Sequence, residues 1–177
     1  MKRMLGLVVA AILVAACGTK EEAPVAPPKA ADALPADLRL SKAPEGAVLG
    51  VGELKKSAKE GQEVVLRARV GGADDPFVAG RAVMTIADAG TITSCADMDM
   101  GQEGCKTPWD YCCTPREALL ANTATVRVTG PDGQPLKADL RGWKGVEALK
   151  VVVIRGVVGP RPDPAILVID AKGIFVE

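Results

Sequence analysis

The segment from residue 95 to residue 113, CADMDMGQEGCKTPWDYCC, concentrates the side chains of this chain that are capable of chemistry. It contains four of the five cysteines, the only tyrosine and one of the two tryptophans. Thiols at this density can form disulfides, bind a soft metal ion as thiolates, or exchange disulfides with a partner. The four cysteines are Cys95, Cys105, Cys112 and Cys113.

Two disulfides are the first interpretation of these cysteines. Adjacent side chains of an extended chain point in opposite directions, so Cys112 and Cys113 favour different partners. The expected bridges therefore join Cys95 and Cys105 to Cys112 and Cys113, in either order. On the loop-entropy argument each bridge would stabilise the fold by about 2–4 kcal/mol. Paired cysteines are typical of exported proteins.

A metal site or a redox site is the alternative interpretation of the same thiols. Structural zinc sites favour C-x2–4-C pairs, whereas nine residues separate Cys95 from Cys105 and six separate Cys105 from Cys112. The C-x-x-C pattern of thiol–disulfide exchange is absent as well. We therefore expect no metal and no other cofactor, and a cysteine-based metal-binding or redox protein is the second candidate function.

Trp109, Asp110 and Tyr111 are the candidate ligand-binding residues of this segment. Aromatic side chains often form recognition surfaces on small barrels. The competing interpretation is that Trp109 and Tyr111 pack the segment onto the rest of the domain, while Asp110 makes a local turn hydrogen bond after Pro108. We favour packing, because the chain has only two tryptophans, one tyrosine and two phenylalanines.

The composition excludes several classes of function. The chain contains no histidine, which excludes imidazole metal ligands, a Ser-His-Asp triad and a histidine-activated cysteine. No other catalytic constellation is evident, so we expect no catalytic residues and no enzyme. The 22 basic and 22 acidic side chains cancel. Without a basic excess the chain lacks the electrostatic footprint of nucleic-acid binding, which is not expected either.

Residues 1–16 predict an export signal. Two basic residues precede an apolar run that is too short to span a bilayer and suits the core of a signal peptide. The run ends Val14-Ala15-Ala16-Cys17, which resembles the lipobox of bacterial lipoproteins. The resemblance implies cleavage before Cys17, lipidation of Cys17 with acyl chains such as palmitate, and a stable membrane anchor.

The residues after the signal predict a tether. Under the sorting habits of lipoproteins, Gly18 implies the outer membrane, with the domain facing the periplasm. The segment from residue 17 to residue 46 is rich in proline and alanine and has little apolar periodicity, which predicts a disordered linker. The chain is thus expected in the cell envelope, where its partner would be an envelope protein, a glycan or a small ligand.

From residue 48 onward, short strands alternate with turns. Glu63 to Val70 alternates apolar and polar side chains, the period of a half-buried strand, and Val151 to Val158 is apolar enough for burial on both faces. Thr114-Pro115-Arg116-Glu117 predicts a capping box that opens a short helix. Other strands are expected at 81–88, 124–129 and 165–176, with a bulge near 171–173, and other helices at 50–59 and 144–150.

A helix between the third and fourth of five strands resembles an OB-fold. The stretch GVGELKKSAKEGQEVVLRARVGG also resembles the start of bacterial OB domains. These resemblances imply an all-β fold with short helices, a five-stranded OB-fold-like Greek-key barrel over residues 48–177. A disulfide-stapled insertion at residues 91–122 would separate strands two and three.

The run CKTPWDYCC, residues 105–113, resembles a CxTPWDYCC-type segment of uncharacterised exported proteins, which implies location alone. The function expected from all these features is a membrane-tethered binding or interaction module that presents the stapled loop on an OB-like barrel.

Overall fold

The computed structural model describes residues 32–98 and 104–177. The predicted signal peptide, Cys17 and the first part of the predicted tether lie outside the described residues. Within the described residues, no helix is both long enough and apolar enough to cross a bilayer.

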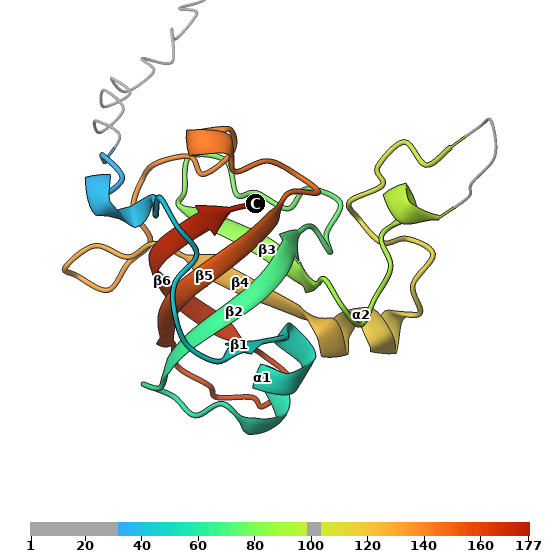
Figure 1. Ribbon diagram of the computed structural model, residues 1–177, viewed down its shortest axis with the longest axis horizontal. Helices are drawn as coiled ribbons and strands as arrows, with labels where there is room; N and C mark the ends of the chain where they lie inside the picture. The colour runs from blue at the N-terminus through green and yellow to red at the C-terminus, as the bar shows by residue number, and fades with distance from the viewer. Residues whose placement is uncertain (1–31, 99–103) are drawn as a thin grey trace, which may run out of the picture. The chain divides into compact units, whose positions relative to one another are not determined.

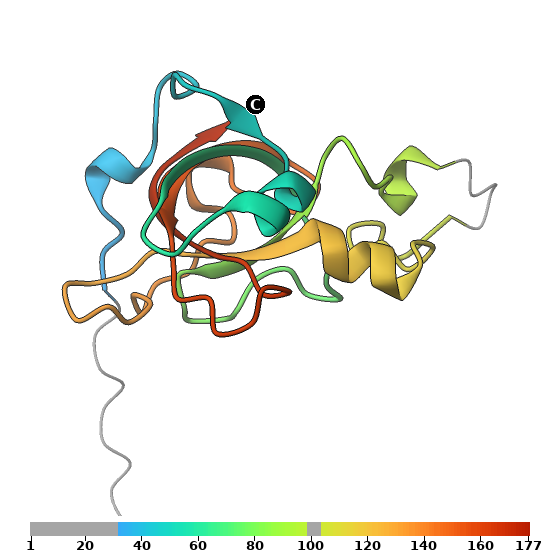
Figure 2. The same ribbon diagram turned by 90° about the horizontal axis from the view of Figure 1, so that it is seen from below.

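The domain is built on six β-strands, five of which close into a barrel (Figure 1). The strands are β1 (Val48–Leu49), β2 (Glu63–Val70), β3 (Val83–Asp88), β4 (Thr123–Arg127), β5 (Val151–Val158) and β6 (Val168–Val176). The sheet runs β1-β2-β3-β4-β6-β5, and pairing of β5 with β2 closes the ring that Figure 2 shows. Within the ring only β4 and β6 are parallel. This is the topology of the OB-fold, as the sequence predicted.

Alternation along the strands fills the barrel with aliphatic side chains. In β2 every second residue from Val64 to Val70 is buried, while Glu63 and Arg67 face solvent. β5 is predicted to be buried on both faces. One face is buried, but the other includes the exposed side chain of Arg155 and is only partly buried. The core therefore consists mainly of aliphatic residues, together with Phe77 and Met84, packed around the interior of one closed sheet.

The predicted bulge in the last strand is confirmed. Arg155 of β5 pairs with Gly173 of β6, but the next residue, Gly156, pairs with Ala171. Lys172 is therefore the extra residue of the bulged strand. A Cβ atom on Gly156 would lie 2.7 Å from the carbonyl oxygen of Asp170, so only glycine allows the two strands to approach here.

The helices agree only in part with the sequence prediction. The α-helices are α1 (Val51–Ser57) and α2 (Arg116–Asn122), and the 3-10 turns are η1 (Ala36–Leu38), η2 (Cys95–Asp97) and η3 (Trp143–Gly145). The helix predicted at 144–150 is wrong, because Lys144 and Leu149 adopt positive φ angles that interrupt a helix. The predicted capping box is wrong as well, since α2 begins after Pro115 without a side-chain cap.

The predicted disordered tether is wrong for residues 32–46. Leu38 is buried in the core, and the backbone N–H of Leu40 donates to the carbonyl of Ile174 at 2.9 Å. Gly173 leaves room for the Leu40 side chain, since a Cβ there would lie 2.8 Å from Leu40 Cδ1. Three leucines in seven residues, Leu34, Leu38 and Leu40, offer enough apolar surface to offset the cost of ordering the chain.

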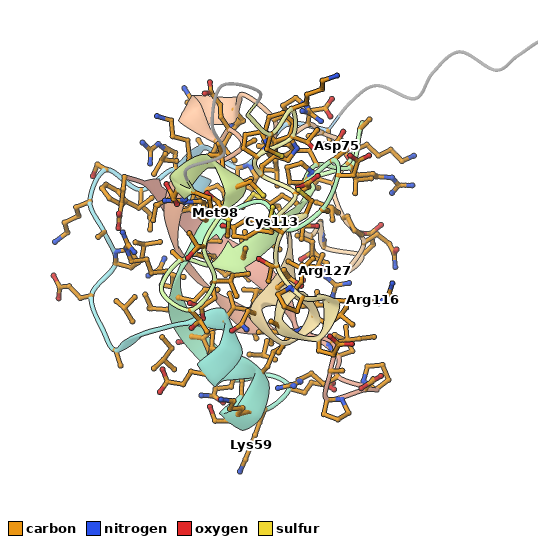
Figure 3. The ribbon with its side chains drawn as sticks, turned by 90° about the vertical axis from the view of Figure 1, so that its right-hand side faces the viewer. Lys59, Asp75, Met98, Cys113, Arg116 and Arg127 are labelled. Atoms are coloured by element: carbon orange, nitrogen blue, oxygen red, sulfur yellow. The ribbon has the colours of Figure 1, made fainter. Side chains whose placement is uncertain are left out.

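The cysteine-rich insertion lies between β3 and β4, the second and third strands of the barrel, as predicted. It projects to one side of the barrel in both ribbon views and ends in α2, which leads directly into β4 (Figures 1 and 2). Figure 3 faces this side of the molecule and shows Met98 and Cys113 near the centre of the view.

Candidate functional site

Asp88, the last residue of β3, fixes the point where the insertion leaves the barrel. Its Oδ1 accepts hydrogen bonds from the backbone N–H groups of Gly90 and Thr91, at 3.0 and 3.1 Å. Its Oδ2 accepts from the N–H of Gly52 in α1, at 3.0 Å. Burial alone would raise the pKa of Asp88, but these bonds together outweigh it and hold that pKa below its usual range. The insertion therefore starts from a rigid turn.

The first arm of the insertion carries Cys95. The 3-10 turn η2 begins at Cys95, and the N–H of Asp97 donates to the carbonyl of Ser94 at 3.0 Å. Cys95 is only 3% exposed, so this thiol faces the interior of the insertion rather than solvent.

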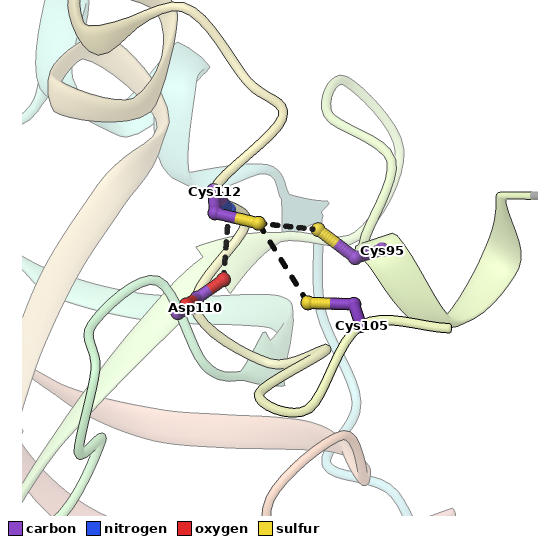
Figure 4. Close-up of side chains that lie close together, drawn as sticks. All are labelled: Cys95, Cys105, Asp110 and Cys112. Carbon is purple, nitrogen blue, oxygen red and sulfur yellow. Dashed lines mark hydrogen bonds between the residues drawn. The ribbon is translucent and has the colours of Figure 1, made fainter. Parts of the chain in front are cut away.

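The second arm carries Cys105, Cys112 and Cys113. A turn around Asp110 shapes it: Asp110 Oδ2 accepts from the Thr107 hydroxyl at 2.7 Å, and Oδ1 accepts from the N–H of Cys112 at 2.8 Å. Asp110 thus makes the local turn hydrogen bond that its position after Pro108 predicts. This turn directs the Cys112 side chain back toward the first arm (Figure 4).

Gly71 and Gly72, at the end of β2, receive the second arm. The N–H of Gly72 donates to the carbonyl of Trp109 at 2.7 Å, and a Cβ on Gly71 would lie 2.6 Å from that same oxygen. The Trp109 indole donates to the carbonyl of Asp74 at 2.9 Å, while Tyr111 is only 1% exposed. The two aromatic residues therefore pack the insertion onto the barrel, which is the interpretation that the sequence favours.

The two arms bring the cysteine sulfurs together around Cys112. Cys112 Sγ lies 3.5 Å from Cys95 Sγ, 3.6 Å from Cys105 Sγ and 3.9 Å from Cys113 Sγ. Figure 4 shows the first two of these contacts, with Asp110 beside them. One ligand atom from each of Cys95, Cys105, Asp110 and Cys112 lies within 4.8 Å of all the others.

The predicted disulfides are not formed among the described residues. All four cysteines carry free thiols, and their separations exceed the covalent S–S length of about 2.05 Å. The sequence argument treats the cysteines as two separate pairs, whereas Cys112 is almost equally close to Cys95 and Cys105. The arrangement is a cluster of thiols rather than two pairs.

The thiols of the cluster differ in acidity. Burial raises the pKa of Cys95, but hydrogen bonds from the Cys113 backbone N–H and from neighbouring thiols outweigh it and leave that pKa below its usual value. The pKa of Cys112 is raised, first because its thiol interacts with Cys95 and then with Cys105. The pKa of Cys113 is raised as well, first through its interaction with Cys95, so Cys95 ionises more readily than either Cys112 or Cys113.

The sequence argument against a metal site depends on spacing along the chain. That argument does not hold for the folded chain. The η2 turn and the Asp110 turn bring potential metal ligands from distant positions to within 4.8 Å of one another. Arg69, Ser94 and Asp97 contact one another at the base of the cluster. Arg69 resembles any other charged residue on the solvent face of a strand, so no local pattern reveals its contacts.

No protein-family model matches the chain, and no curated protein sequence matches it. Among solved structures, the chain is similar to the hypothetical protein YgiW from E. coli, at 19% identity and a TM-score of 0.39. The match covers 76% of this chain and 94% of the other.

Proposed function

We propose that the cysteine-rich insertion binds a thiophilic metal ion, for which Zn²⁺ is the best fit. The observation that carries this proposal is the spacing of the sulfurs. In a tetrahedral site with Zn–S bonds of about 2.3 Å, neighbouring ligand sulfurs lie about 3.8 Å apart. Cys112 Sγ lies 3.5, 3.6 and 3.9 Å from the sulfurs of Cys95, Cys105 and Cys113, which is close to that value.

Cys95, Cys105 and Cys112 supply three of the four ligands in this proposal. The fourth is the thiolate of Cys113 or the carboxylate of Asp110, and both lie beside Cys112. Thiolates with or without a carboxylate are a donor set that suits Zn²⁺, whereas Cu⁺ prefers sulfur alone. Binding would release the protons of the neutral thiols, so metal affinity would rise with pH.

Cys112→Ser tests the proposal, because Cys112 contacts each of the other three sulfurs. We expect the full-length protein, purified without chelator, to hold about one zinc ion per chain in elemental analysis. The Cys112→Ser variant is expected to lose the metal, while Lys106→Ala, an exposed residue of the same arm, keeps it. Cys113→Ser and Asp110→Asn, compared in the same assay, identify the fourth ligand.

Alkylation of each cysteine, measured peptide by peptide, distinguishes bound metal from disulfides. With metal bound, we expect Cys95, Cys105 and Cys112 to resist alkylation until a chelator is added, without any need for a reductant, and Cys113 to resist it as well if it is the fourth ligand. Alkylation that requires a reductant, together with no stoichiometric metal, would overturn the proposal. That result would favour the other candidate function, a disulfide-stapled loop that recognises an envelope protein, a glycan or a small ligand. Cys95 and Cys105 both lie close enough to Cys112 for either to be its disulfide partner after a small movement.

We also propose that Cys17 is lipidated and tethers the domain in the cell envelope, at the outer membrane and facing the periplasm. The lipobox-like run before Cys17 supports this. Cys17→Ala is expected to abolish metabolic labelling with palmitate and to remove the acyl mass from the intact protein, because Cys17 is the cysteine that follows the lipobox-like run. The matched variant Cys105→Ala should keep the label. Label retained in Cys17→Ala would refute the lipid anchor.

A further inference from the structure

Arg69 lies on the outer face of β2, directly below the cysteine-rich insertion. Its neighbours in the sheet are Ala87 of β3 and Val151 of β5. Arg67 occupies the equivalent outward position two residues earlier, but its side chain is 45% exposed, against 22% for Arg69. The insertion covers Arg69 and leaves Arg67 more open to solvent, so the two arginines of one strand form a natural comparison.

The Arg69 guanidinium holds the first arm. Arg69 Nη1 donates to the Ser94 hydroxyl oxygen at 2.8 Å and forms an ion pair with Asp97. The Ser94 hydroxyl in turn donates to Asp97 Oδ2 at 3.0 Å. Since Ser94 and Asp97 flank Cys95, this triad fixes the turn that presents the Cys95 thiol.

The second arm meets the same arginine through Tyr111. Arg69 Nε and Tyr111 Oη are both buried and have no hydrogen-bond partner among the described residues. The Tyr111 ring packs against Gly71, two residues after Arg69, since a Cβ on Gly71 would lie 3.1 Å from Tyr111 Cε2. Tyr111 immediately precedes Cys112, the central thiol of the cluster. Arg69 therefore contacts the first arm close to the point where Tyr111 of the second arm packs against the barrel.

We infer that Arg69 is the barrel residue that positions the thiolate site, by holding the Cys95 arm through Ser94 and Asp97 beside the Tyr111 that anchors the Cys112 arm. The inference rests on the proposed metal-binding function. Arg69 acts through the residues that flank the ligands rather than as a ligand itself. Outer contacts of this kind set ligand orientation, and their loss typically weakens metal binding 10- to 100-fold.

Arg69→Gln is the test, with Arg67→Gln as the matched control from the same face of β2. Arg67 forms a bidentate pair with Glu177, at 2.9 and 2.7 Å, so the C-terminus holds its side chain rather than either arm of the insertion. We expect chelator competition for Zn²⁺ to show about 10- to 100-fold weaker binding in Arg69→Gln and less than about a twofold change in Arg67→Gln. Arg69→Lys, which can still pair with Asp97, should recover part of the affinity.

Two further measurements keep the test decisive. Co²⁺ in place of Zn²⁺ should give visible bands that shift in Arg69→Gln but not in Arg67→Gln, a response to ligand geometry that general destabilisation does not produce. If Arg69→Gln fails to fold, Asp97→Asn breaks the same ion pair from the insertion side and should weaken binding similarly.

The contrary outcomes are distinguishable. Wild-type protein that binds no metal would overturn the proposed function and this inference with it. Wild-type binding together with unchanged affinity in Arg69→Gln, or equal losses in the two arginine variants, would overturn the inference alone.

Discussion

Tyr111→Ala should lower the free energy of unfolding by about 3–5 kcal/mol, the usual cost of truncating a buried aromatic side chain. The Tyr111 ring is almost fully buried, and its Cε2 would lie 3.1 Å from a Cβ on Gly71. Its removal leaves a cavity at the contact between the insertion and β2. Urea denaturation gives the change in stability, and limited proteolysis shows whether the insertion has become accessible.

Tyr111→Phe is the control for that experiment. It keeps the ring and removes a hydroxyl that has no hydrogen-bond partner among the described residues. Because leaving a buried polar group unpaired costs about 1–3 kcal/mol, we expect the phenylalanine variant to be at least as stable as the wild type. A clear loss of stability in Tyr111→Phe would mean that the Tyr111 hydroxyl makes a hydrogen bond, which would contradict its unpaired state in the structure.

Asp88→Ala is expected to cost about 2–4 kcal/mol, since hydrogen bonds to a charged group are among the strongest in proteins. The substitution removes the acceptor of three backbone N–H groups, those of Gly52, Gly90 and Thr91. It would loosen both α1 and the start of the insertion. The matched control is Asp132→Ala, at a turn residue that accepts one N–H, from Gln134 at 3.0 Å.

The same carboxylate predicts a pH dependence of stability. The pKa of Asp88 is lower in the folded protein than in the unfolded chain, where about 3.9 is usual. Its contribution is therefore fully present above the unfolded pKa and is lost as the pH falls through the folded pKa. Unfolding at a series of pH values below about 5 should show a weaker pH dependence in Asp88→Asn than in the wild type. Identical profiles would contradict the assignment.

The barrel supports the insertion, and the insertion carries the cysteines. The closed sheet provides a rigid platform, and the end of β2, from Arg69 to Gly72, receives both arms of the insertion. A surface site built this way leaves Cys112 and Cys113 exposed, while Cys95 is buried. In the proposed metal site, an exposed ligand such as Cys112 would allow a bound ion to exchange with ligands outside the chain more readily than in a closed structural site.

The sequence by itself determined the barrel, because the information is local. The alternation from Glu63 to Val70 and the apolar run from Val151 to Val158 match β2 and β5 residue for residue, and the bulge at Lys172 lies where Ala171 and Gly173 indicate. Strand period and turn residues act over a few neighbours, so they can be recognised without knowledge of the fold. The place of the insertion followed from the order of these strands.

Only the tertiary structure decided that residues 32–46 belong to the folded domain and how the cysteines meet. Leu38 and Leu40 find their partners far along the chain, Leu40 on β6, and no local pattern distinguishes them from a linker. The thiols converge because Arg69, Gly72 and Asp110 hold the two arms in place. Spacing along the chain suggested two disulfide pairs and argued against a metal. Distances in space, set by contacts between remote residues, instead bring the thiols together as one cluster.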